Sequence, residues 1–124
     1  MASALQKFTL VFYTPSSALA ACKAAIFRAG AGRYPGPGGY TECCWSTTGT
    51  GQFRPGDAAN PHIGKVGEVE AVEEVRVETL CVGEDVARGA VKALKEYVYQ
   101  LAQKGYLLMA DQGTPLRGAC VSSV

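Results

Sequence analysis

The feature that most constrains the fold is the alternating segment VEAVEEVRVETLCV, residues 69–82. In an extended chain, successive side chains point to opposite sides, so alternation separates two faces. One face is mainly apolar and the other mainly charged: the first holds Val75, Val77, Thr79 and Cys81, and the second holds Glu74, Arg76, Glu78 and Leu80. This pattern predicts a strand with one buried face. Because Val72 falls out of step, we also expect a bulge or a change of register near Glu73.

Three other segments have the composition of strands. KFTLVFYT, residues 7–14, alternates throughout and is rich in aromatic and β-branched residues, which favours a strand with both faces largely covered. YTECCWSTT, residues 40–48, predicts a short strand between two long glycine-rich connections. YLLMA, residues 106–110, predicts a last short strand.

Two segments have helical periodicity. The first predicts a helix from about residue 17 to 29, with one of the two serines after Pro15 as its cap and Gly30 at its end. The second begins at one of the acidic residues after Gly83 and carries an apolar stripe until Gly105. Both helices are amphipathic enough to cover a sheet.

The order strand, helix, strand, strand, helix, strand predicts an α+β fold. We expect a ferredoxin-like βαββαβ arrangement, a four-stranded antiparallel sheet with two helices on one face. Residues 1–124 would form one domain with a core from about 7 to 112, and residues 113–124 would be an edge extension or a frayed tail. The other sheet face would carry Val11 and Tyr13 among charged side chains, which suits a subunit interface.

Composition excludes several classes of partner. Twelve basic and eleven acidic residues leave a formal charge of +1, which provides no general attraction to nucleic acid or to anionic lipid. No apolar run approaches the ~20 residues of a membrane-spanning helix, and the first residues lack the pattern of a signal peptide. We therefore expect a cytoplasmic protein that binds neither nucleic acid nor membrane.

Several long motifs resemble a known family. RAGAGRY, followed by ECCWSTTGTGQFRPGDAANPHIGKVGEVEAVEEVRVETLC, closely resembles the small PII-like or CutA-like domain inserted in some YbgI/YqfO-type dinuclear-metal proteins, the NGG-interacting-factor-like family. Such a domain also occurs as a free-standing bacterial protein, and the likeness covers residues 7 to about 96. It implies a ferredoxin-like fold that assembles through its sheets into dimers or trimers.

The resemblance implies no settled activity. The His and carboxylate cluster of the dinuclear-metal domain is missing from this chain, which has one histidine, so metal-dependent hydrolysis is not implied. Relatives commonly close the second helix with an HPYEEPAY-like segment, whereas this chain has ALKEYVYQLAQKGYLLMADQG. A function tied to that segment is not carried over.

The glycine-rich connections allow two interpretations. Glycines beside Arg33 and Arg54 could form tight turns only, or their amides could curl around an anion. PII proteins hold nucleotide in clefts between subunits, so the resemblance favours a small anionic metabolite or nucleotide as ligand. The predicted ligand-binding residues are Arg33, Gly49, Thr50, Gly51, Gln52, Arg54, Asn60 and His62.

His62 also allows a catalytic interpretation. A lone histidine in a loop is most often held by packing or by one hydrogen bond, but it can act as a base near neutral pH. In a small enzyme, Arg54 would be the oxyanion or carboxylate clamp, and Tyr13 or Tyr40 the proton donor. No residue is firmly assigned as catalytic, and we favour a protein that is not an enzyme.

The five cysteines predict neither disulfides nor a metal centre. Cys43 and Cys44 are adjacent, so in a strand they face opposite sides, although Cys81 on the neighbouring strand could approach one of them. Two thiols with one distant histidine make a poor metal site, and free cysteine is commonly buried. We expect no metal and no cofactor.

These observations converge on a non-enzymatic, oligomeric PII/CutA-like module that binds a small ligand or has a regulatory role. Its site would be the segment from Gly49 to Gly67, with Arg33 contributing from the first glycine-rich connection. Two alternatives stay open: a small cofactor-independent enzyme that uses His62 and Arg54, and a purely structural oligomerisation module.

Overall fold

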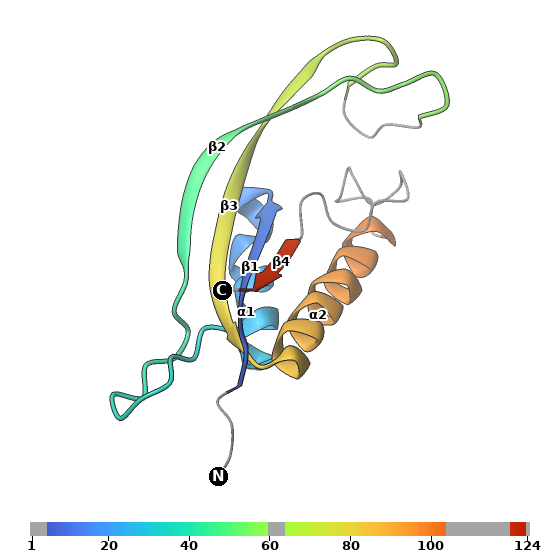
Figure 1. The fold of residues 1–124 in the computed structure, drawn as a ribbon. Coiled ribbons are helices and arrows are strands. Elements are labelled where there is room, and N and C mark those ends of the chain that lie inside the picture. Colours follow the sequence, from blue (N-terminus) through green and yellow to red (C-terminus); the bar gives the residue numbers. More distant parts are fainter. Residues whose placement is uncertain (1–4, 60–63, 104–119, 124) are drawn as a thin grey trace.

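The computed structural model describes residues 5–59, 64–103 and 120–123 (Figure 1). The elements follow one another as β1 (Lys7–Thr14), the short 3-10 turn η1 (Ser16–Ala18), α1 (Leu19–Arg28), β2 (Trp45–Phe53), β3 (Glu70–Val82), α2 (Glu84–Gln103) and β4 (Cys120–Ser123). The predicted α+β class is confirmed.

All neighbouring strands in the sheet are antiparallel, and their order is β2-β3-β1-β4. β3 is the longest strand and pairs with both β2 and β1. Phe12 lies opposite Val77 and Leu10 opposite Thr79, so the apolar faces predicted for these two strands coincide. Directly opposite residues share a face of the sheet, and this register therefore builds one continuous apolar surface.

Both helices pack on that apolar surface. The core joins residues of β1 and β3 to residues of η1, of both helices and of the turn after α1: Leu10, Phe12, Val75, Val77, Cys81, Ala18, Cys22, Ile26, Ala31, Ala87, Ala90 and Leu94. Phe12, Leu10, Ile26 and Leu94 are wholly buried. Removing side chains of this size from water stabilises the fold by roughly 1.5–3 kcal/mol each, which explains why the helices lie on this face.

The β2–β3 ribbon continues past the rest of the sheet and curves away from it (Figure 1). β1 ends where Thr14 lies opposite Val75, whereas β2 and β3 stay paired as far as Phe53 and Glu70. At the tip, the Gly67 N–H donates to the Pro55 carbonyl at 2.8 Å, and the Arg54 Nη1 donates to the Gly67 carbonyl at 2.7 Å. These bonds hold the tip together without help from the core.

Two expectations for this ribbon were wrong. The register runs without a break through Thr50–Glu73 and Gly51–Val72, so β3 has no bulge near Glu73. This part of the strand lies beyond the core, so its side chains need not alternate between a buried and an exposed face. An apolar residue out of step therefore does not indicate a bulge here. The second strand also does not span residues 40–48: it begins at Trp45 and continues through two glycines to Phe53, because β3 offers each of these residues a partner and pairing outweighs weak strand propensity.

The bounds of α1 and the start of α2 agree with the prediction except at one cap. α1 is preceded by η1, and no serine side chain caps either element. The Ala18 N–H donates instead to the Pro15 carbonyl, and Gly30, at φ +104°, follows the helix end as expected. α2 begins at Glu84 as predicted.

The last part of the chain is described only at its final strand. The expected strand at 106–110 and the helix end at Gly105 lie outside the described residues. Cys120–Ser123 pairs with β1 at the edge of the sheet, in the segment expected to be an edge extension or a frayed tail.

Candidate functional site

The face of the sheet opposite the helices, called the open face from here on, has no helix on it in the described part of the chain. Tyr13 lies opposite Arg76, and Val11 lies opposite Glu78. Apolar and charged side chains are therefore mixed there, as the alternation predicted, and most are partly exposed. β2 extends this face and is exposed on both sides, with only Gly51 buried among its nine residues.

Arg76 is the central charge of the open face. Its Nη1 donates to the Glu78 Oε2 at 3.1 Å, with about a third of the Arg76 side chain and two fifths of the Glu78 side chain exposed. The hydrogen bond to the Glu78 carboxylate raises the pKa of Arg76 above its usual value, and a hydrogen bond to the Tyr13 side chain raises it further. The open face therefore keeps a fixed positive charge.

A hollow of about 330 Å³, called the strand groove from here on, lies beside this charge. It is lined by Tyr13, Thr47, Gly49, Thr50, Gly51, Glu74 and Arg76. The absence of a side chain at Gly49 helps to leave it open, since a Cβ built there would meet nothing within 4 Å. The groove thus brings three predicted ligand residues together with Tyr13, predicted only as a proton donor in an enzyme, and with three residues that were not predicted: Thr47, Glu74 and Arg76.

The backbone at Gly49–Gln52 does not form the predicted anion-binding loop. These residues belong to β2 and pair with Ala71–Glu74 of β3. Their peptide groups alternate in direction along the strand, so their amides do not converge on one point. A ligand here would meet side chains of the open face: Glu74 lies directly opposite Gly49 in the register, and Arg76 is the positive charge that lines the same groove.

The other predicted ligand residues are spread along the molecule. Arg54 is exposed at the ribbon tip and bonds to the Gly67 carbonyl, while Gln52 is exposed opposite Ala71. Asn60 and His62 lie outside the described residues. Whether they contribute to a ligand site stays a prediction.

Arg33 and Tyr40 lie in the connection before β2, at the end of that strand opposite to Arg54. Both are exposed, Tyr40 by 71%. Within one chain, the length of β2 separates them from Arg54. The expectation that Arg33 and Arg54 line one cleft therefore requires residues from a second subunit.

A second hollow, of about 390 Å³, opens where this connection meets the sheet, and Cys43, Cys44, Tyr34, Trp45 and Glu78 are among its lining residues. Cys43 is fixed there by its backbone: its N–H donates to the Gly32 carbonyl at 3.0 Å, and its carbonyl accepts from the Thr79 Oγ1 at 2.8 Å. The two cysteines are partly exposed free thiols.

Cys22 and Cys81 are buried in the core instead, and burial raises the pKa of both thiols. Cys44 packs against that same core. Among the residues that the structure describes, no three histidine, cysteine or acidic side chains gather as they would around a metal ion. No helix in the described ranges is long and apolar enough to cross a membrane.

Comparison with known proteins identifies sequence relatives of this chain. A GTP cyclohydrolase 1 type 2 homolog of Mycobacterium leprae is 48% identical over 81 residues, which are 65% of this chain and 20% of that protein. The homolog of Halalkalibacterium halodurans is 31% identical over 109 residues, 88% of this chain and 28% of that protein. This chain thus spans about a fifth to a quarter of these relatives. No family model matches it.

A solved structure has the same fold. The crystal structure of a Bacillus cereus protein related to NIF3 matches 98% of this chain with a TM-score of 0.62 and 24% sequence identity, over 26% of its own length. The sequence relatives and this structure each match the chain over only part of their own length. The chain is thus homologous to a part of proteins of the YbgI/NIF3-like family.

Proposed function

We propose that this protein is an oligomeric PII/CutA-like module that binds a small anionic metabolite or nucleotide and acts by regulation, not by catalysis. The strand order β2-β3-β1-β4 and the packing of both helices on one face support a ferredoxin-like fold for it. Homology to this family supports a regulatory role only at a general level, and the strand groove supports the class of ligand.

The observation that carries the proposal is the strand groove. It holds Gly49, Thr50 and Gly51 on the helix-free side of the sheet, and a tyrosine hydroxyl and a guanidinium lie beside them. A phosphate or carboxylate would compete with Glu78 for the donors of Arg76, and Tyr13 would offer a further hydrogen bond. Glu74 on the same wall would favour a ligand that also presents hydrogen-bond donors, as a nucleobase or ribose does.

Self-association is supported by the exposure of β2. This strand is exposed on both sides, contains no charged residue, and begins with Trp45, of which 56% is exposed. An uncharged edge strand of nine residues is a surface that proteins usually cover. A second copy on the open face would cover it and would close the strand groove into a cleft between subunits, with about 800 Å² buried on each partner in a typical interface.

A nucleotide is the first ligand to test, because the name of the sequence relatives refers to GTP. The chain spans only part of those proteins, so the name guides the choice of ligand and not the choice of reaction. We would titrate GTP, ATP, AMP and inorganic phosphate separately and follow thermal unfolding, since a ligand that binds the folded state raises Tm.

The matched variants are Gly49→Val and Gly56→Val. A Cβ at either glycine would meet nothing within 4 Å, and neither glycine has a positive φ, so both variants should fold. Only Gly49→Val fills the strand groove, and it should abolish the ligand-induced rise in Tm. If Gly49→Val binds as the unmodified chain does, the groove is not the site.

The alternatives give different outcomes in the same samples. An enzyme would turn over its substrate and lose turnover in His62→Ala, whereas a purely structural module would assemble without binding any of the ligands. Arg54→Ala separates two locations of the site, because it should weaken binding only if the ribbon tip of one subunit reaches the groove of another. A compact monomer by small-angle scattering at micromolar concentration would contradict the oligomeric part of the proposal.

A further inference from the structure

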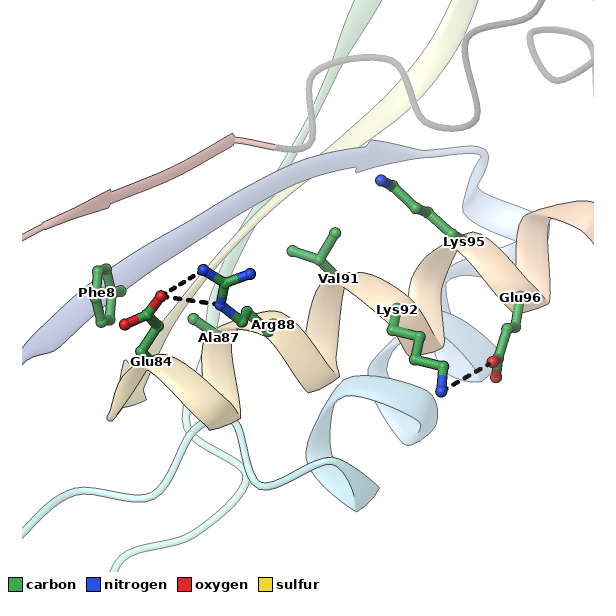
Figure 2. A pocket seen from close by; sticks show the side chains of 8 residues that line it. All are labelled: Phe8, Glu84, Ala87, Arg88, Val91, Lys92, Lys95 and Glu96. Atoms are coloured by element: carbon green, nitrogen blue, oxygen red, sulfur yellow. Dashed lines mark hydrogen bonds and ion pairs between the residues drawn. The ribbon is translucent and has the colours of Figure 1, made fainter.

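A separate hollow lies on the helix side of the sheet, between α2 and β1 (Figure 2). We call it the helix groove. Its volume is about 560 Å³, within the ~300–1,000 Å³ of typical small-molecule sites. Phe8 of β1 and Ala87 and Val91 of α2 give it an apolar floor. It shares no lining residue with the strand groove.

Three basic side chains of α2 line the same groove: Arg88, Lys92 and Lys95. Arg88 is paired with Glu84 at 2.5 Å, and Lys92 with Glu96 at 4.0 Å. All four paired side chains are more than 60% exposed, and ion pairs as exposed as these are weak and readily exchanged. With three cations and two carboxylates, the lining has a net charge of +1.

Lys95 is the unbalanced cation. Within residues 5–59, 64–103 and 120–123, no carboxylate is paired with it. Figure 2 shows Lys95 and Val91 on the same side of α2, while the Lys92–Glu96 pair points away from them. Residues four apart on a helix are neighbours, so the Lys95 ammonium can reach a polar group held at the edge of the apolar floor.

We infer that the helix groove binds a small amphiphilic anion, an apolar chain or ring that bears one acidic group. The apolar part would cover Phe8 and Val91, both of which are only partly buried. The acidic group would meet Lys95 and could draw Arg88 away from its exposed carboxylate partner. One anionic group balances the one excess positive charge of the lining, which a neutral apolar molecule or a cation would not do.

The test is an NMR titration of the full chain with sodium decanoate below its micelle concentration, and with decanol as the neutral counterpart. Decanoate should shift the amide signals of α2 between Ala87 and Glu96 and of Phe8, and it should bind more tightly than decanol. Lys95→Glu should weaken decanoate binding about fivefold or more. Lys65→Glu, an equal charge change on an exposed loop residue far from this groove, should not.

A second variant keeps the test decisive if Lys95→Glu alters folding. Val91→Phe enlarges a partly buried side chain in the groove and should lower decanoate affinity while the thermal unfolding curve stays cooperative. Equal affinity for decanol and decanoate, equal weakening by both lysine variants, or unchanged binding by Val91→Phe would overturn the inference. So would broadening of α2 signals with protein concentration alone, because a second copy would then occupy the groove.

This inference is independent of the proposed function. Gly49→Val, which fills the strand groove, should leave decanoate binding unchanged. Failure of GTP to bind would likewise not contradict the binding of decanoate in the helix groove.

Discussion

The two faces of the sheet use the same central strands in opposite ways. On the helix face, Leu10, Phe12 and Val77 are wholly buried. On the open face, the adjacent residues Val11, Tyr13 and Arg76 are partly exposed. One step along the chain therefore moves a residue from a packed core to a surface available for recognition. Mutations at neighbouring positions should accordingly change different properties of the protein.

The largest expected effect is at Phe12. Phe12→Ala should lower the free energy of unfolding by about 3–5 kcal/mol, because it leaves a cavity in a fully packed site. Tyr13→Ala, one residue further and partly exposed, should cost about 1 kcal/mol or less. Urea unfolding of the two variants measures the difference. Equal losses would mean that the open face is as tightly packed as the helix face.

A second pair of variants compares a crowded glycine with an open one. Gly32 has φ +78°, and a Cβ there would lie 2.8 Å from the backbone N and O of Cys43. Gly32→Ala should therefore destabilise the fold by at least about 2 kcal/mol, from left-handed strain plus this clash. Gly49→Ala should stay within about 0.5 kcal/mol of the unmodified chain. Thermal unfolding of both variants would show whether the close contact between Gly32 and Cys43, just before β2, is needed for stability.

The buried cysteines distinguish the two faces of the sheet through the pH dependence of stability. Burial raises the pKa of Cys22 and Cys81 in the folded chain, so at alkaline pH these thiols keep protons that the unfolded chain releases. The unfolded state then binds fewer protons, and stability should fall as pH rises above about 8.5, the usual thiol value. Urea unfolding between pH 7 and 10 should show this fall, and Cys81→Ala should show a shallower one.

The same thiols should differ in reactivity. In a Cys120→Ser background, Ellman's reagent at pH 8 should label Cys43 and Cys44 quickly, and Cys22 and Cys81 only after denaturation, because only the first two are accessible. Fast labelling of all four would contradict the closed state of the helix face.

The smallest expected effect is at the Arg76–Glu78 pair. Both side chains are substantially exposed, so Glu78→Gln should change Tm only slightly, and the change should shrink further at 1 M salt. The same variant frees Arg76 and should strengthen binding of an anion in the strand groove. A large, salt-insensitive loss of stability would instead show that the open face is buried in an assembly.

The elements that the sequence predicts best are those whose side chains form the core. Alternation in residues 70–82 identified the buried face of that strand, and helical periodicity located both helices, because burial of apolar side chains imposes these patterns. Residues 7–14 were expected to be covered on both faces, but only the face with Leu10 and Phe12 is buried. Residues 45–53 lack such a pattern, and pairing with β3 alone decides where this strand begins and ends. For a related reason, the sequence predicted only some of the residues that line the strand groove. Glycines signal an unusual backbone, but Arg76 and Tyr13 reach the groove through register, which no local motif encodes.

The continuous β3 strand has a consequence for motion. From Val75 to Glu78, its backbone is paired with a strand on both sides; from Thr79 to Val82 it is paired with β1, and its buried residues lie under the helices. From Glu70 to Glu74, it is paired only with β2 and lies beyond the core. Amide hydrogen exchange should therefore change abruptly between Glu74 and Val75: the outer amides should exchange through local opening of the ribbon, and the inner ones only when the whole domain unfolds. A single strand would then carry both the most and the least protected backbone of the sheet.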